Sequence, residues 1–179
     1  MKRYRLIIFD RDGTLNYEEQ NYHRDLTALR PYPFSGPALR ALKAAGHRLA
    51  LATNQSGISH GLWSRVEVEQ LHGRFFADWG LELPVYMCPH VPDDGCTCRK
   101  PLPGLILQAL ADHDCEAAST LMVGDSTTDA GAAGSAGVDF ALVLTGRGKL
   151  TQTRLTRPPV MLLDTVAALA TSLSPDADE

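Results

Sequence analysis

The chain has 179 residues, of which 44% are hydrophobic and 21% charged, a composition typical of a globular protein with one sizeable core. Its formal net charge of −4 argues against a general nucleic-acid binder, and no apolar run approaches the length of a membrane span. The basic N-terminus leads into only four apolar residues before Asp10, too few for the core of a signal peptide. We therefore expect a single domain over residues 1–179, located in the cytoplasm.

The first predicted strand, residues 4–10, is an apolar run that ends on Asp10 and is followed by Asp12, Gly13 and Thr14. In open α/β folds such a strand end lies at the crevice where ligands bind. Two acids spaced i, i+2 would face opposite sides of a regular strand, so the backbone must turn after Asp10 if both serve one site. Gly13 supplies the freedom to turn. The pattern favours a functional site over a simple acidic turn.

A long polar stretch, residues 15–33, follows and predicts a loop or flap over this edge of the molecule. Ser35 is the expected N-cap of the next helix, which should stop at Gly46. The second predicted strand, residues 47–53, ends on a polar turn that should share the crevice with Asp10. The hydroxyl, amide and small residues of that turn are Thr53, Asn54, Gln55, Ser56 and Gly57.

After a capping box that begins at Ser64 and a third strand over residues 84–88, four soft metal ligands lie within eleven residues. These ligands are Cys88, His90, Cys96 and Cys98, a set that predicts a structural zinc site because four protein ligands leave no open position. The alternative is separate free thiols and a surface histidine. Cys115 has no such neighbours and is expected to be a buried thiol. The adjacent cations Arg99 and Lys100 are side chains of the kind that bind phosphate, lysine as a point charge and arginine as a planar group.

The last third of the chain repeats the strand and helix alternation. A fourth strand, residues 119–125, ends on Asp125, and a helix of small residues follows Asp129. A fifth strand over residues 139–144 runs into Thr145 and Gly146, and a short last strand, residues 160–163, precedes a helix that Asp164 is expected to cap. Alternating strands and helices predict an α/β fold with a parallel sheet and helices on both faces. No gap in the pattern is long enough for a large cap domain.

Four short motifs in chain order resemble those of the haloacid dehalogenase (HAD) superfamily of phosphohydrolases, and the resemblance covers essentially the whole chain. It implies an HAD-like Rossmannoid fold with a zinc-binding loop, and Mg²⁺-dependent hydrolysis through an aspartyl phosphate. Such a two-step route suits a carboxylate nucleophile with a second acid beside it. In this reading Asp129 orients a loop or caps a helix. The implied roles are Asp10 as nucleophile, Asp12 as proton donor and later base, Thr53 and Lys100 as phosphoryl ligands, and Asp10, Asp12 (through its carbonyl) and Asp125 as Mg²⁺ ligands.

A narrower resemblance is to the D-glycero-D-manno-heptose-1,7-bisphosphate 7-phosphatases and the related histidinol-phosphatase domain. It is carried by the stretches Phe9–Asn16, Thr53–Gly57, Cys88–His90 and Cys96–Pro101. It implies a small phosphorylated sugar as substrate, with loss of the C7 phosphate of the heptose bisphosphate, and histidinol phosphate as the alternative. The chain is expected to be a monomer. The implied substrate-binding residues are Asn54, Gln55, Ser56 and Arg99.

Two functions of other classes are weighed against this one. A polynucleotide 3′-phosphatase would share the Asp-x-Asp-Gly-Thr chemistry, but the acidic balance of the chain speaks against it. A catalytically inactive, zinc-stabilised binding module would have lost at least one catalytic group. All five are present, namely Asp10, Asp12, Thr53, Lys100 and Asp125.

Overall fold

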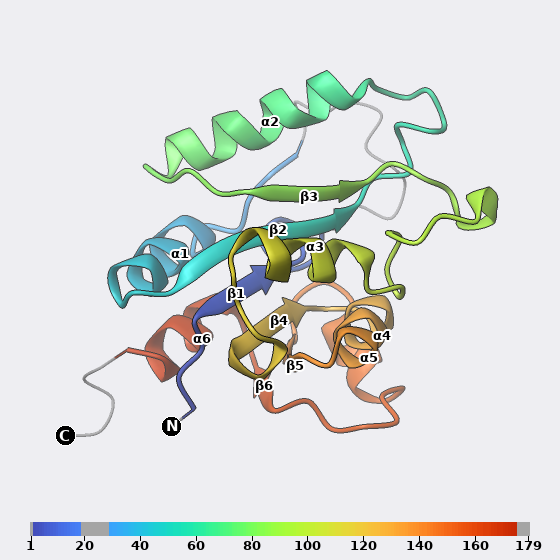
Figure 1. Cartoon of the computed structure of the whole chain (residues 1–179). Coiled ribbons are helices and arrows are strands. Elements are labelled where there is room, and N and C mark those ends of the chain that lie inside the picture. Colours follow the sequence, from blue (N-terminus) through green and yellow to red (C-terminus); the bar gives the residue numbers. More distant parts are fainter. Residues whose placement is uncertain (1, 19–28, 175–179) are drawn as a thin grey trace.

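Six parallel strands form one sheet in the computed structural model, which describes residues 2–18 and 29–174 (Figure 1). The strand order is β3-β2-β1-β4-β5-β6, so the chain runs outwards from β1 to β3 and then crosses back to place β4 on the other side of β1. The crevice between the carboxyl ends of β1 and β4 is therefore a topological switch point, where open α/β sheets bind ligands. The strands are β1 (Leu6–Phe9), β2 (Arg48–Asn54), β3 (Val85–Cys88), β4 (Thr120–Gly124), β5 (Asp139–Val143) and β6 (Met161–Leu163).

Helices cover both faces of this sheet, as the sequence predicts (Figure 1). α1 and α6 pack together on one face, and α3 and α4 pack together on the other. α2 lies along the β3 side of the molecule (Figure 1). The helices are α1 (Ser35–Ala44), α2 (Arg65–Asp78), α3 (Gly104–Asp112), α4 (Thr127–Ala136), α5 (Gly148–Gln152) and α6 (Val166–Ser172), with 3₁₀ turns η2 (Pro92–Asp94) and η3 (Ala117–Ser119).

The central strand β1 is buried on both faces, which explains its unbroken apolar run. Ile7 and Phe9 pack with α1 and α6, whereas Leu6 and Ile8 pack with α3 and α4. All four side chains have 0% exposure. Because successive side chains of a strand point to opposite faces, one short segment anchors both halves of the core and fixes the position of Asp10 at its end.

Several local predictions can be compared with the structure. The capping box at Ser64 is confirmed, with reciprocal bonds to Glu67. The prediction that Ser35 caps α1 is wrong, because its hydroxyl donates to the Leu15 carbonyl at 2.7 Å and makes no capping bond. Thr165, and not Asp164, caps α6. The short helix α5 was not predicted, since five residues are too few to show a helical period.

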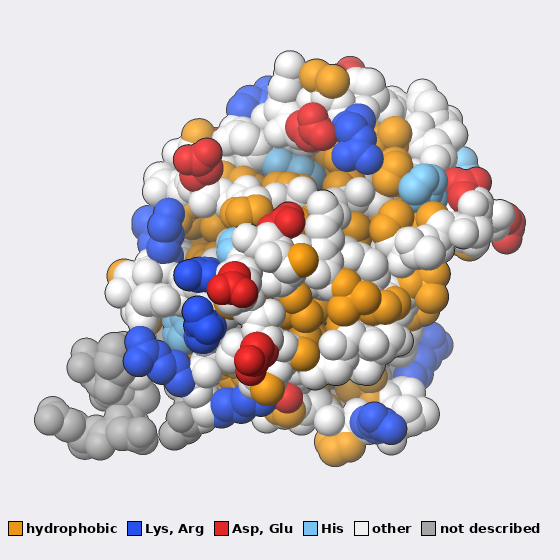
Figure 2. All heavy atoms as spheres, viewed as in Figure 1, with side chains coloured by type: hydrophobic (Ala, Val, Ile, Leu, Met, Phe, Trp, Pro, Cys, Tyr) orange, Lys and Arg blue, Asp and Glu red, His pale blue; other side chains and the backbone are white. Residues whose placement is uncertain are grey.

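The predicted flap is described only at its two ends, because residues 19–28 lie outside the described residues. At these ends Asn16 forms isolated bridges with Asp12 and Pro31, and Leu15 and Leu29 are buried. On the face drawn in Figure 2, acidic and basic side chains are interspersed. Among the described residues, no helix has the length and apolar character needed to cross a membrane.

Candidate active site

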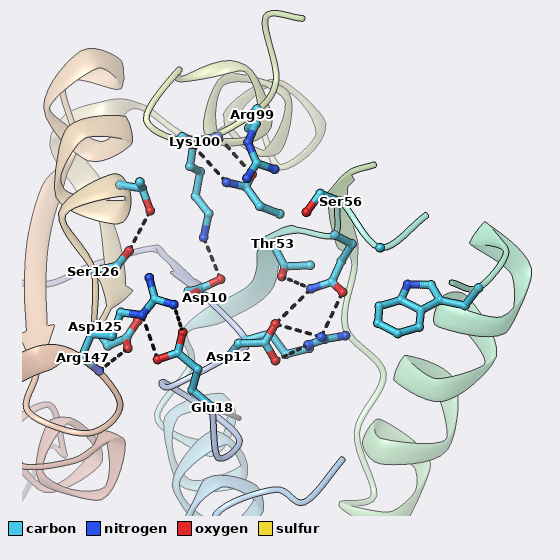
Figure 3. Close-up of a pocket in the computed structure, with 16 residues that line it drawn as sticks. Asp10, Asp12, Glu18, Thr53, Ser56, Arg99, Lys100, Asp125, Ser126 and Arg147 are labelled. Atoms are coloured by element: carbon cyan, nitrogen blue, oxygen red, sulfur yellow. Dashed lines mark hydrogen bonds and ion pairs between the residues drawn. The ribbon is translucent and has the colours of Figure 1, made fainter. Parts of the chain in front are cut away.

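A pocket of about 320 Å³ opens at the carboxyl edge of the sheet, beside the switch point between β1 and β4 (Figure 3). Its walls come from the segments that follow β1, β2, β4 and β5 and from the loop that follows β3. The predicted residues that share this one pocket are Asp10, Asp12, Thr53, Asn54, Gln55, Ser56, Arg99, Lys100 and Asp125, together with the unpredicted Arg11, Glu18, Trp63 and Arg147.

Lys100 is buried at the floor of this pocket, with all three ammonium protons directed to protein oxygens. It donates to Asp10 Oδ1 at 2.7 Å (Figure 3). It also donates to Asp129 Oδ1 at 2.6 Å and to the Ala52 carbonyl at 2.8 Å. Burial alone would lower the pKa of Lys100, but the charges of Asp10 and Asp129 raise it above its usual value. Lys100 is therefore a permanent cation next to the predicted nucleophile.

Three carboxylates cluster at this end of the pocket, and two of them, Asp10 and Asp129, contact Lys100. Ligand oxygens of Asp10, Asp125 and Asp129 all lie within 4.8 Å of one another. Burial and then the Asp129 charge raise the pKa of Asp10 to about 7, and burial and then the Asp10 charge raise the pKa of Asp125 to about 8. Carboxylate oxygens are the ligands that a hard divalent cation such as Mg²⁺ prefers. This cluster at the carboxyl edge of the sheet carries more negative than positive charge, so it suits such a cation.

Asp129 has a different part in this cluster. Its Oδ2 accepts from the Ser126 backbone and hydroxyl in the capping box of α4, while its Oδ1 accepts from Lys100. Both expected roles, helix capping and orientation of the neighbouring loop, are thus present. With both oxygens occupied, Asp129 fixes Lys100, which leaves Asp10 and Asp125 as the carboxylates suited to a cation.

Asp12, the second acid of the Asp-x-Asp pair, has an electrostatic environment opposite to that of Asp10. Asp12 accepts two bonds from Arg11, at 3.0 and 2.8 Å, and one from Gln55 (Figure 3). Asn16 donates a further bond to Asp12. Burial would raise the pKa of Asp12, but the Arg11 charge and these hydrogen bonds outweigh it and lower the pKa to about 2. In this state Asp12 is a carboxylate, the form that can accept a proton.

Arg11 is itself held by a buried histidine. Its Nη1 lies 3.2 Å from His72 Nε2, and its Nη2 donates to Gln55 Oε1 at 3.0 Å. Burial and then the Arg11 charge lower the pKa of His72 to about 3, so the imidazole is neutral and accepts from the guanidinium through Nε2. His72 on α2 is thereby connected, through Arg11, to Asp12.

The turn after β1 is also packed against the end of β4. Gly13 has φ +79°, and a Cβ built there would overlap the carboxylate of Asp125. The prediction that Gly13 makes the turn is confirmed. Glycine is needed here for a second reason as well, because any side chain would displace Asp125 from the site.

The polar turn after β2 is largely committed to bracing its neighbours. The Asn54 amide donates to the Lys100 carbonyl and accepts from the Lys100 N–H, at 3.0 and 3.1 Å. The Gln55 amide donates to Thr53 Oγ1 at 2.9 Å and to Asp12. Ser56 lies at the pocket wall beside them (Figure 3). In this structure the side chains of Asn54 and Gln55 hold Lys100, Thr53 and Asp12 in place, a role that residue type alone did not reveal.

The four soft ligands after β3 come together as the sequence predicts. Their ligand atoms all lie within 4.8 Å of one another, with Cys88 Sγ 3.8 Å from Cys96 Sγ and 3.5 Å from His90 Nδ1. A tetrahedron with zinc–sulfur bonds of about 2.3 Å has S···S edges of about 3.8 Å, so the group fits a tetrahedral zinc ion. The fourth ligand, Cys98, lies 3.4 Å from His90 Nδ1.

This cysteine and histidine loop is joined to the pocket through Arg99. The Arg99 Nη1 donates to the His90 carbonyl at 2.8 Å, and the side chain lines the pocket across from Asp12 (Figure 3). Cys115 is buried, as expected, and lies apart from the ligand group.

Four titratable residues at or directly behind the pocket had no role assigned from the sequence, namely Arg11, His72, Glu18 and Arg147. Arg11 lies between Asp10 and Asp12 in the sequence. A cation next to two acids could have indicated that it pairs with one of them. His72 follows the core residue Val68 by four positions, which places a histidine on the apolar face of a helix. Glu18 and Arg147 form an ion pair of 2.6 Å at the pocket wall between loops far apart in the sequence, so no local pattern could have indicated it (Figure 3).

Comparison with known proteins places these features in a family. A family model described as HAD-hydrolase-like matches residues 97–169. A D-glycero-β-D-manno-heptose-1,7-bisphosphate 7-phosphatase from Pseudomonas putida is 39% identical over 174 residues, covering 94% of this chain and 99% of the relative.

Solved structures agree. A D,D-heptose 1,7-bisphosphate phosphatase from B. bronchiseptica, complexed with magnesium and phosphate, matches with a TM-score of 0.88 and 36% identity over 97% of this chain and 98% of that one. A D,D-heptose 1,7-bisphosphate phosphatase from Burkholderia thailandensis matches with a TM-score of 0.72 and 27% identity over 94% and 97% of the two chains. The chain belongs to the D-glycero-D-manno-heptose-1,7-bisphosphate 7-phosphatase family of HAD-type phosphatases.

Proposed function

We propose that the protein removes the C7 phosphate of D-glycero-D-manno-heptose 1,7-bisphosphate. The observation that carries the proposal is the convergence of Asp10, Thr53, Lys100 and Asp125, from four separate parts of the sequence, on one pocket in a chain whose relatives bear that activity in their names. The proposed substrate is a small phosphorylated sugar, and the relatives' names specify the β anomer.

Asp10 is the proposed nucleophile. Its carboxylate attacks the phosphorus of the C7 phosphate, the bond from phosphorus to the sugar oxygen breaks, and an aspartyl phosphate forms on Asp10. Lys100, 2.7 Å from Asp10 and held by Asp129, offsets the negative charge that gathers on the phosphoryl oxygens. Thr53 at the pocket wall supplies a hydroxyl to one of them.

Asp12 moves the proton in both steps. In the second step it takes a proton from the water that cleaves the aspartyl phosphate. Its low pKa of about 2 in the free protein means that Asp12 is ionised and has an oxygen able to accept a proton. In the first step it donates a proton to the leaving sugar oxygen. A phosphate dianion beside Asp12 raises its pKa, so Asp12 takes up a proton from solvent as substrate binds and gives that proton to the leaving oxygen. The proton taken from water in the second step then returns Asp12 to the protonated form.

A magnesium ion is proposed as the cofactor, with Asp10, the backbone carbonyl of Asp12 and Asp125 as protein ligands. The pKa values of Asp10 and Asp125 are raised by burial and then by neighbouring carboxylates, and such a cation would balance the charge of those carboxylates. When bound, it would neutralise charge on the phosphoryl oxygens and orient them for in-line attack. The relative from B. bronchiseptica was solved with magnesium and phosphate.

Substrate recognition and the metal loop are linked in this proposal. Arg99 is proposed to contact the rest of the sugar phosphate, because its planar guanidinium suits a phosphate and it lines the pocket away from Asp12. Zinc held by Cys88, His90, Cys96 and Cys98 is proposed to be structural and to fix Arg99 through the His90 carbonyl.

Three further expectations from the sequence belong with the proposal. A cytoplasmic site of action is supported by four free cysteines, three of them in a ligand group that requires reduced thiols. A single domain over residues 1–179 and a monomeric state stay predictions.

The deciding experiment compares kcat/KM for heptose 1,7-bisphosphate and for histidinol phosphate on the same preparation. We expect the heptose bisphosphate to be the better substrate by at least about 100-fold, since a site built for a second phosphate rejects a substrate that lacks it. Equal slow rates on both, or a preference for histidinol phosphate, would reject the proposed substrate. An aryl-phosphate assay with and without Mg²⁺ separates an enzyme from an inactive binding module, which would show no turnover.

A further inference from the structure

The segment after β5, Thr145 to Arg147, has no place in the chemistry proposed above, yet it is packed against the end of Asp125. The Arg147 backbone N–H donates to Asp125 Oδ2 at 2.7 Å (Figure 3). Gly146, which lies between Thr145 and Arg147 in the chain, has φ +51°. A Cβ built on Gly146 would overlap both Asp125 Oδ2 and Gly13 Cα. Three strand-end loops, those after β1, β4 and β5, thus meet at one carboxylate oxygen.

A second contact locks this arrangement. The Thr145 hydroxyl donates to the Gly13 carbonyl at 2.6 Å, which ties the loop after β5 to the loop that follows the nucleophile. Asp125 is buried, with 2% exposure, so its carboxylate is oriented by protein contacts. The Arg147 hydrogen bond and the missing side chain at Gly146 act directly on Asp125. The Thr145 bond acts on the Gly13 turn, which itself packs against the Asp125 carboxylate.

We infer that Thr145, Gly146 and Arg147 form a positioning element that sets the affinity of the site for Mg²⁺ by fixing one oxygen of Asp125 and leaving the other for the cation. Outer contacts of this kind orient metal ligands and commonly determine metal affinity. The inference rests on the proposed magnesium site. None of the three residues is a metal ligand in this assignment, and Gly146 acts through the space that it leaves.

The test measures Mg²⁺ binding directly, by isothermal titration of the full chain dialysed free of magnesium, with no substrate present. Gly146→Ala should weaken Mg²⁺ binding by about 10-fold to 100-fold, because its methyl group overlaps Asp125. The matched control is Gly80→Ala. Gly80 also has positive φ, at +66°, but it is exposed and a Cβ there meets no heavy atom within 4 Å.

Both variants carry the backbone strain of a left-handed alanine and should lose a few degrees of thermal stability. Only Gly146→Ala should lose Mg²⁺ affinity as well. Equal Mg²⁺ affinities in the two variants, or a wild-type protein that binds no Mg²⁺, would overturn the inference.

A second pair of variants keeps the test decisive if Gly146→Ala fails to fold. Thr145→Val removes the hydroxyl that bonds to Gly13 and should weaken Mg²⁺ binding several-fold, whereas Thr145→Ser retains the hydroxyl and should bind Mg²⁺ nearly as the wild type does. Identical binding by the valine and serine variants would contradict the positioning role. A wild-type protein that binds Mg²⁺ but leaves heptose bisphosphate intact would reject the proposed substrate and not this inference.

Discussion

Asp10 and Asp12 stand two residues apart in the sequence but have opposite electrostatic environments. Burial and the nearby charge of Asp129 raise the pKa of Asp10 to about 7, although Lys100 works against this shift. Arg11 and two amides hold the pKa of Asp12 at about 2, against the effect of burial. Two neighbouring carboxylates with separated pKa values are the usual basis for assigning different roles to each.

Replacing the proposed nucleophile, Asp10, gives the sharpest test at this scale. Asp10→Asn keeps the size of the side chain but removes the attacking oxygen anion, so kcat should fall by about 10⁴-fold or more, as for other covalent nucleophiles. Steady-state assays and circular dichroism should show lost turnover in a folded protein. Asp78→Asn, at an exposed position in α2, is the matched control and should keep full activity. Near-normal turnover by Asp10→Asn would end the nucleophile assignment.

His72 predicts a pH dependence of stability. Its pKa is about 3 in the folded protein, because burial and Arg11 oppose protonation, and about 6.5 when unfolded. The unfolded state therefore binds a proton first as pH falls below 6.5, and the free energy of unfolding drops as pH falls towards 3. This contribution is fully present above pH 6.5.

The variant His72→Gln does not titrate and keeps a polar group near Arg11. Between pH 7 and pH 5 the wild type should lose about 2 kcal/mol more stability than this variant, at about 1.4 kcal/mol per pH unit below 6.5. Urea denaturation at the two pH values measures the free energy of unfolding of each protein. The contributions of the other titrating groups cancel when the loss in the variant is subtracted from the loss in the wild type. Parallel losses in the two proteins would contradict a buried neutral histidine.

At the scale of elements, the loop after β3 has little apolar support of its own. Cys88 is buried at the end of β3, but Pro92 to Asp94 form only a single 3₁₀ turn with no buried residue. The loop nevertheless positions Arg99 through the His90 carbonyl and leads directly into Lys100. A metal ion at its ligand group would supply the order that packing does not.

The prediction for this element is one zinc ion per chain in protein purified without chelators, measured by elemental analysis. Cys98→Ser should lose most of the zinc and lower the melting temperature, because a structural zinc contributes folding free energy. Cys115→Ser is the matched control, since Cys115 lies outside the ligand group, and should retain the metal. Equal zinc contents in the two variants, or none in the wild type, would disprove the zinc site.

For the whole molecule, the position of the site follows from the strand order. The chain places β1 between β2 and β4, so Asp10 and Asp125 directly follow neighbouring strands at the switch point. Thr53 lies at the carboxyl end of β2, on the other side of β1. The packing of the central strand β1 therefore holds the site in place as well as the core.

This dependence is measurable by comparing a central and an edge position. Ile7→Ala, at a side chain with 0% exposure in β1, should lower the free energy of unfolding by about 2 to 5 kcal/mol. Leu162→Ala, in the edge strand β6 with 45% exposure, should change it by no more than about 0.5 kcal/mol. Urea denaturation of the two variants checks this, and similar losses in both would mean that β1 is not the centre of the core.

Much of the site could be predicted because its signals are local. The order of the four motifs, the acids and hydroxyls at strand ends and the ligand set from Cys88 to Cys98 are all contained in short stretches of sequence. A strand that ends in a polar group has to present that group at the edge of a parallel sheet, so Asp10, Thr53 and Asp125 could be placed together without coordinates.

What only the tertiary structure decided is which of these groups touch. Lys100 is held by Asp129, Asp12 by Arg11 and Arg11 by His72, and each partner is chosen by packing between distant segments. The prediction that Ser35 caps α1 was wrong for the same reason, because its hydroxyl bonds to the carbonyl of Leu15, a residue distant in the sequence. The sequence alone thus determined the chemical groups at the sheet edge, because residue type and strand ends are local properties. Tertiary structure decided their charge states and orientations, because burial and contact are properties of the folded chain.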